Sequence, residues 1–86
     1  MKLKLTDTQT ARLKFTHVKS GKPSELFIAM NPLTGDWLQD HRIGDTRTSY
    51  ISDKPTALKL ANNIIDSSQK NHLHCSVEVM ATKRQP

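Results

Sequence analysis

Residues 26–38, LFIAMNPLTGDWL, contain an apolar run, a turn and the start of a returning arm. Pro fixes φ at about −65° and Gly tolerates positive φ, so the NPLTG segment at 31–35 is predicted to be a tight hairpin turn. The five-residue run at 26–30 is then the entering strand rather than a short helix. Because this run is continuous instead of alternating, we expect a central strand that is covered on both faces.

A strand and a helix are predicted after this hairpin. Residues 39–46 are polar and are either a twisted continuation of the returning arm or a loop, and residues 47–51 form a short strand. Asp53 can cap a helix and Pro55 is tolerated in its first turn, so we expect a helix from Lys54 to about Lys70. The apolar face of this helix comprises Ala57, Leu60, Ala61, Ile64 and Ile65.

The C-terminal part of the chain alternates most regularly. Residues 72–79 are predicted to form a strand whose apolar face closes onto the helix; this face comprises Leu73, Cys75, Val77 and Val79. Residues 81–86 contain no apolar side chain larger than alanine, so a flexible basic tail is expected there.

The N-terminal part alternates as well, at residues 1–5 and again at 11–18, with turn-forming residues at 20–24. We therefore predict two further strands, which can pair as a hairpin. Together these elements give a single α+β domain over residues 1–80. It has an antiparallel sheet of four to five strands with one helix packed on one face, in the order β-β-β-β-α-β.

The composition indicates a small soluble domain. Eighty-six residues with 35% hydrophobic content give a thin core, which a partner chain could complete, so a homodimer is an option. The single cysteine, Cys75, cannot form an intramolecular disulfide, and no apolar run has export or membrane-spanning length. We expect a cytoplasmic protein that does not associate with membranes.

Positive charge is concentrated towards the ends of the sequence. The formal net charge is +5, and residues 1–22 hold six bases against one acid, whereas residues 23–80 hold five bases against seven acids. A basic segment of this kind can attract a polyanion. The candidate binding residues are Lys2, Lys4, Arg12, Lys14, Lys19 and Lys22.

Arg12, Lys14 and Thr16 are expected to line one exposed surface, with Lys2 and Lys4 beside them if the strands at 1–5 and 11–18 pair. Such a surface suits phosphate contacts, which give affinity without sequence reading. Phe15 lies on the opposite face, so no aromatic stacking platform is expected beside Arg12 and Lys14. The other interpretation is a charged face that keeps the sheet soluble or binds a protein.

Other candidate chemistry has an ordinary structural explanation beside it. His72 and His74 share one face of the predicted strand and could begin a zinc site, but Cys75 points the other way, and a solvated strand face is the alternative. The acids near His41, namely Asp36, Asp40 and Asp45, could bind an ion or act as acid and base, or belong to a polar loop. Cys75 is expected to be an inert buried thiol, and Trp37 a core residue rather than an exposed contact.

No nucleophile elbow, glycine-rich phosphate loop or paired Cys-x-x-Cys is present in the sequence. We therefore expect no enzymatic activity, no cofactor and no metal.

The order of strand, NPxTG turn, strand, helix beginning PTALKLA and final VxV strand is similar to that of many small phage and plasmid proteins. Over residues 26–80 the layout also resembles integrase arm-binding domains and positive-cofactor-like single-strand DNA binders. The aromatic and arginine positions of those binders have no clear match here, and the C-terminal strand departs from both. The resemblance therefore concerns layout alone and implies no site residues.

Two functions follow as hypotheses. The first is a non-enzymatic regulatory or accessory protein that binds nucleic acid through the basic N-terminal strand face. The alternative is a protein-binding inhibitor of a host nucleic-acid machine, of the anti-CRISPR or anti-restriction type, which uses the same face or the polar segment at 39–46. Affinity for free nucleic acid that falls steeply with salt distinguishes the first from the second.

Overall fold

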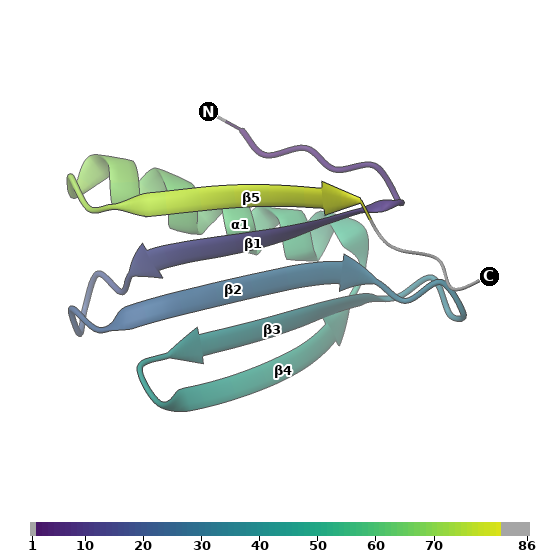
Figure 1. The fold of residues 1–86 in the computed structure, drawn as a ribbon, viewed down its shortest axis with the longest axis horizontal. Helices are drawn as coiled ribbons and strands as arrows, with labels where there is room; N and C mark the ends of the chain where they lie inside the picture. Colours follow the sequence, from purple (N-terminus) through teal and green to yellow (C-terminus); the bar gives the residue numbers. More distant parts are fainter. Residues whose placement is uncertain (1, 82–86) are drawn as a thin grey trace.

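Five antiparallel strands form one sheet in a computed structural model that describes residues 2–81, and one helix follows the fourth strand (Figure 1). The spatial order of the strands is β4-β3-β2-β1-β5. The predicted order β-β-β-β-α-β is confirmed. The elements are β1 (Gln9–Thr16), β2 (Pro23–Met30), β3 (Trp37–Ile43), β4 (Thr46–Ser52), α1 (Lys54–Lys70) and β5 (Cys75–Ala81).

Helix α1 has the predicted limits because its end signals are local. The Asp53 carboxylate accepts a hydrogen bond from the Thr56 N–H at 2.9 Å, and Pro55 lies in the first turn. Hydrogen bonds from the Thr56 side chain and from its backbone N–H hold the pKa of the Asp53 carboxyl below its ordinary value. The chain then reverses through His72, which has a φ of 54°. Consequently β5 begins at Cys75, three residues later than predicted, and ends at Ala81.

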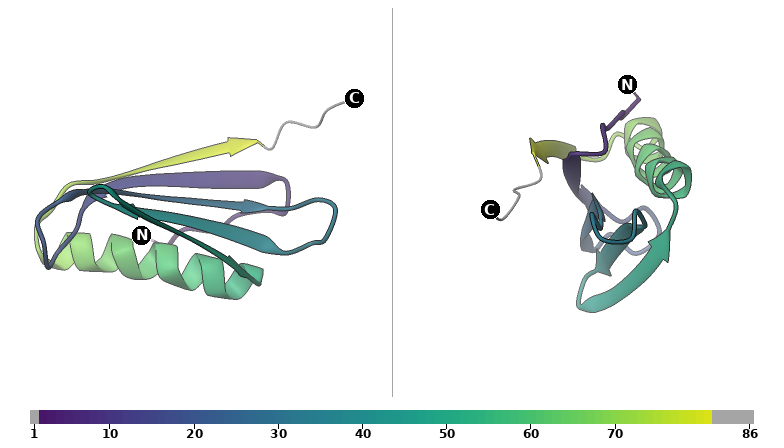
Figure 2. Two further views of the ribbon diagram at one scale, coloured as in Figure 1. Left: turned by 90° about the horizontal axis from the view of Figure 1, so that it is seen from below. Right: turned by 90° about the vertical axis from the view of Figure 1, so that its right-hand side faces the viewer.

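The core lies between α1 and one face of the sheet, which we call the inner face (Figure 2). Leu13, Leu26 and Ile28 are fully buried there, and Trp37 is 2% exposed, so the prediction that Trp37 belongs to the core is confirmed. The helix buries its small residues Ala57 and Ala61 against the sheet. Of the elements that the structure describes, α1 covers the inner face and none covers the opposite, outer face (Figure 2).

The predicted strand at residues 1–5 is wrong for the part that the structure describes. Residues 2–5 form no strand and pack on α1. There the Leu3 N–H donates to Asn62 Oδ1 at 2.6 Å, and Asn62 Nδ2 donates to the Leu3 carbonyl at 3.2 Å. Leu3 and Leu5 are buried as the alternation indicates. Residues 2–5 cannot pair with β1 in the sheet, because β1 already pairs with β2 on one side and with β5 on the other.

Strand β2 is covered on one face only, which corrects the expectation of coverage on both. Leu26 and Ile28 point into the core, whereas Phe27 and Ala29 lie on the outer face and are half-buried. The segment at 39–46 is resolved as a continuation of β3 to Ile43, followed by a two-residue turn at Gly44 and Asp45. Gly44 has a φ of 58°, which suits the first position of a type II′ hairpin turn.

Two further expectations concern the C-terminal tail and the absence of a membrane-spanning segment. Most of the expected flexible basic tail, residues 82–86, lies outside the described residues. The helix of the described chain has neither the length nor the apolar stretch needed to cross a membrane.

Candidate binding surface

The outer face carries charged side chains on all five strands, arranged in rows by the strand register. One row runs from Lys14 through Glu25 and Arg42 to Arg47. The next row contains Glu78, Arg12, Phe27, Asp40 and Ser49, and a third contains Ala29, Leu38 and Ile51. We call the first two rows the charged rows.

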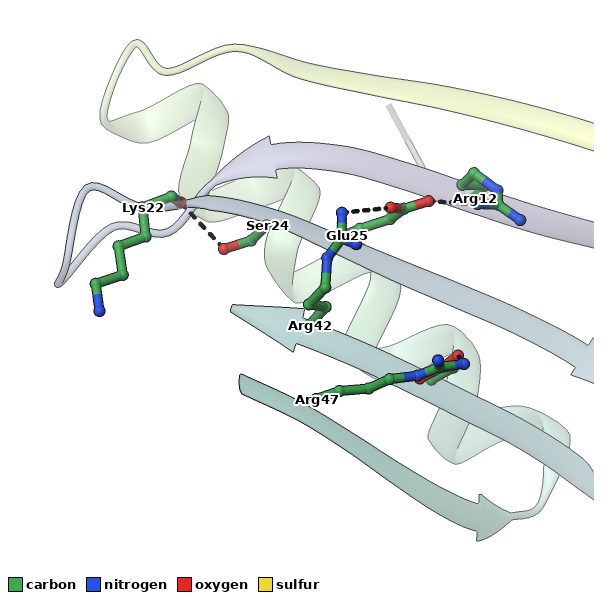
Figure 3. Close-up of polar contacts among 7 residues, drawn as sticks. Arg12, Lys22, Ser24, Glu25, Arg42 and Arg47 are labelled. Atoms are coloured by element: carbon green, nitrogen blue, oxygen red, sulfur yellow. Dashed lines mark hydrogen bonds and ion pairs between the residues drawn. The ribbon is translucent and has the colours of Figure 1, made fainter. Parts of the chain in front are cut away.

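Each of the three arginines in the charged rows pairs with a carboxylate (Figure 3). Glu25 accepts from Arg12 Nη1 at 2.5 Å and from Arg42 Nη2 at 3.1 Å. Asp40 accepts from Arg47 Nε at 2.8 Å and also from its Nη2. The hydrogen bonds from Arg47 hold the pKa of the Asp40 carboxyl below its ordinary value. The arginines are therefore oriented, and their charge is partly neutralised.

Phe27 lies in the middle of the charged rows. The guanidinium carbon of Arg12 is 5.1 Å from the centre of the Phe27 ring, within cation–π range. The outer face therefore includes one aromatic side chain that the alternation of residues 11–18 does not reveal.

Three lysines gather where the β1–β2 hairpin turns. Lys14 lies near the end of β1, and Lys19 and Lys22 lie in the turn that follows. None of these lysines forms an ion pair with another residue of the described chain. Lys22 packs on Gly44, so the β1–β2 turn lies against the β3–β4 turn.

Bases outnumber acids in the turns at one end of the sheet, where Lys19 and Lys22 stand beside one acid, Asp45. The β1–β2 turn, the Gly44–Asp45 turn and the loop after α1 meet at one end of the sheet (Figure 1), which we call the hairpin end. At this end Lys14, Arg42 and His74 line a depression of about 350 Å³ together with the acid Glu25. The turns at the other end contain Asp7, Asp36 and Asp53.

The six predicted binding residues do not form a single row. Arg12 and Lys14 share the outer face. Lys22 packs on Gly44 at the hairpin end, whereas Lys19 lines a cavity between the β1–β2 turn and α1. Lys2 and Lys4 lie on the other side of the sheet, where they line a groove of about 680 Å³ beside Lys59 of α1. The separation follows from the packing of residues 2–5 on the helix.

The sequence interpretation did not identify Arg42, Arg47 and Phe27. Arg42 and Arg47 flank the Gly44–Asp45 turn and face each other across β3 and β4. The Gly-Asp sequence at 44–45 is typical of a two-residue hairpin loop. A hairpin predicted there would have placed Arg42 opposite Arg47. Phe27 was hidden because a continuous apolar run does not show which side chains face outward.

The residues of the other candidate sites do not lie together in the fold. His72 and His74 precede β5, and no group of three His, Cys, Asp or Glu side chains within residues 2–81 is arranged to hold a metal ion. Asp40 faces outward, whereas Asp36 and Asp45 lie in turns at opposite ends of β3. Cys75 is half-buried, and burial raises the pKa of its thiol.

His41 lies on the inner face beside Phe15, with ring centroids 6.0 Å apart. Its Nε2 atom is buried and has no hydrogen-bond partner among the described residues. Burial, together with the nearby His17, lowers the pKa of His41.

Comparisons of the chain with protein-family models, with curated proteins and with solved structures gave no match.

Proposed function

We propose that the protein is a non-enzymatic accessory protein that binds the phosphate backbone of nucleic acid. The proposed surface is the outer face and its hairpin end. The observation that carries this proposal is the position of the bases. Lys14, Arg42 and Arg47 lie on three strands of the face that α1 leaves uncovered, and Lys19 and Lys22 lie in the β1–β2 turn at its hairpin end.

The proposed surface contains two kinds of base. The three lysines have no ion-pair partner in the described chain, so a phosphate group can approach them without displacing a carboxylate. The arginines already contact Glu25 or Asp40, and phosphate must compete with these carboxylates. We therefore expect modest affinity that falls steeply with salt.

Phe27 is the single aromatic residue of the charged rows, and Arg12 lies against it. Sequence-tolerant binders of single strands stack successive bases on several aromatic residues. One ring supports one stacked base at most, so phosphate contacts supply most of the affinity. The expected binding is independent of sequence.

Two matched triple variants test the location of binding. Lys14→Gln, Lys19→Gln and Lys22→Gln together remove three positive charges from the hairpin end. Lys2→Gln, Lys4→Gln and Lys59→Gln remove three from the groove beside α1. Binding of labelled single-stranded DNA, duplex DNA and RNA is measured by fluorescence anisotropy between about 50 and 200 mM salt.

The hairpin-end variant is expected to lose up to three phosphate contacts. The slope of log K against log salt then becomes shallower by about 2 to 2.7. The groove variant is expected to bind nearly as the unaltered protein does. Equal losses in both variants indicate a response to net charge alone, and a larger loss in the groove variant places the site beside α1; either result contradicts the proposal.

Binding to a protein is the second candidate, favoured by the carboxylates of the same face. Glu25, Asp40 and Glu78 alternate with the arginines, and the neighbouring row is apolar. Mixed charges beside exposed Leu38 and Ile51 suit a protein partner better than a uniform polyanion. Absence of binding to any nucleic acid at low salt, with a stoichiometric protein complex on co-purification, supports this candidate over the first.

A further inference from the structure

Strand β4 forms one open edge of the sheet. Its sheet neighbour among the described residues is β3, and every residue from Thr46 to Ile51 is exposed. Tyr50 and Ile51 are 54% and 75% exposed, and Leu38, beside Ile51 on β3, is 39% exposed. An edge of this kind offers unpaired N–H and C=O groups to another strand.

The pattern of hydrogen bonds shows which backbone groups of β4 point away from the sheet. The Asn31 N–H donates to the Asp36 carbonyl at 2.7 Å, so the backbone groups of residues 38, 40 and 42 face β2. Successive residues of an antiparallel strand face opposite sides, so residues 37, 39, 41 and 43 face β4. Their partners are residues 52, 50, 48 and 46. The backbone groups of Arg47, Ser49 and Ile51 therefore point outward.

Strand β4 lacks the features that usually protect an edge. Its sequence, TRTSYIS, contains no Lys or Pro, and its register with β3 runs without a bulge. Three of its seven residues are β-branched and one is aromatic, which favours strand pairing. Its one charged side chain, Arg47, already pairs with Asp40 of the same chain.

We infer that two copies of the chain pair through β4 in antiparallel orientation, with Ser49 of each copy opposite Ser49 of the other. In this register Thr46 lies opposite Ser52 and Arg47 opposite Ile51, so the whole strand is paired. All three outward-facing residues then occupy hydrogen-bonded positions. A register centred on Thr48 or Tyr50 leaves residues at one end of the strand without a partner in the opposite strand.

Charge favours a second copy as the occupant of this edge. Like charges directly opposite each other destabilise a strand pair, and in this register Arg47 meets Ile51 rather than another Arg47. The aliphatic part of Arg47 can cover the exposed Ile51. The two-fold arrangement also closes the assembly, whereas β4 pairing with β5 of the next copy would continue into a filament.

Dimerisation joins two outer faces into one continuous surface. Because β3 and β4 lie at the joining edge, Arg42 and Arg47 of both copies lie near the two-fold axis. The inference rests on the strand edge and does not depend on nucleic-acid binding.

Sedimentation analysis of the chain from about 1 to 200 µM tests the assembly. The mass is expected to rise from one chain to two and then remain constant. A monomer over the whole range overturns the inference, as does a mass that continues to rise.

Ser49→Pro tests the edge itself. Proline removes the outward N–H and leaves the bonds to β3 intact, since residue 49 does not donate to β3. The dimer dissociation constant is expected to rise at least about tenfold, whereas Ser49→Thr should leave it nearly unchanged. Equal dimerisation of the proline variant, with circular dichroism showing an intact fold, contradicts the inference.

Cross-linking tests the register and does not rely on the proline variant folding. In a Cys75→Ser background, Ser49→Cys places two Cα atoms about 5.5 Å apart across the axis, within disulfide range. Arg47→Cys places its counterpart about 13 Å along the partner strand, which is out of range. Oxidation should give a covalent dimer of the first variant only. Equal cross-linking of both variants, or of neither, overturns the proposed pairing.

Discussion

Replacement of Glu25 by Gln is expected to weaken the fold and strengthen nucleic-acid binding. The Glu25 side chain is 17% exposed and pairs with Arg12 and Arg42, which are 41% and 56% exposed. Partly exposed ion pairs contribute about 0.2 to 1 kcal/mol each, so the loss of two lowers the free energy of unfolding by about 0.5 to 2 kcal/mol. In a domain of this size, 1 kcal/mol lowers Tm by about 4 to 8 °C.

The same substitution frees two guanidinium groups for phosphate. Each added contact steepens the slope of log K against log salt by about 0.7 on single strands and about 0.9 on duplex DNA. Glu25→Gln should therefore steepen the slope by about 1.4 to 1.8, as measured by anisotropy at several salt concentrations. Asp66→Asn makes the same change in charge on the exposed surface of α1 and is the control. An unchanged slope, or weaker binding, refutes phosphate contact by Arg12 and Arg42.

Further predictions concern the fold. Asn62→Ala removes both hydrogen bonds to the Leu3 backbone, and chemical denaturation should show a loss of about 2 kcal/mol in the free energy of unfolding. An unchanged denaturation midpoint contradicts a stabilising role for these two bonds. Gly44→Ala places a residue with a Cβ atom at a φ of 58° and brings that Cβ to 2.9 Å from Lys22 Cδ. Thermal unfolding should therefore show a loss of about 1 to 2 kcal/mol in the free energy of unfolding. Burial places the pKa of folded His41 below its ordinary value of 6.5, so the neutral form is favoured in the fold. Stability should therefore fall as the pH drops through about 6.5 and below, and His41→Phe should reduce this dependence, as followed by Tm; a stability that rises on acidification contradicts it.

Local signals account for what the sequence predicted well. The limits of α1 follow from Asp53, Pro55 and the spacing of apolar residues, all of which act within a few positions along the chain. The hairpin at 31–35 is equally local, since the Asn31 carbonyl accepts from the Gly35 N–H at 2.8 Å within the turn itself.

Long-range packing accounts for what the sequence missed. Alternation at residues 2–5 correctly indicates that Leu3 and Leu5 are buried, but it does not show whether a strand or a helix buries them. The partner is Asn62, which is 59 positions away from Leu3. This one difference separates Lys2 and Lys4 from Arg12 and Lys14.

In the candidate site, too, local sequence patterns predicted some features, whereas features that depend on distant residues were missed. The outward direction of Arg12 and Lys14 follows from alternation within one strand. The approach of Arg42 to Glu25 depends on the register of two strands joined through a turn, and no local pattern specifies it.

Amide chemical-shift mapping by NMR, during titration with a single-stranded oligonucleotide at low salt, tests the central proposal most directly. The account predicts the largest shifts at Lys14, Lys19 and Lys22 and at the adjoining ends of β2 and β3, with small shifts along α1. Shifts confined to α1 and to residues 2–5, or no shifts at all, contradict it.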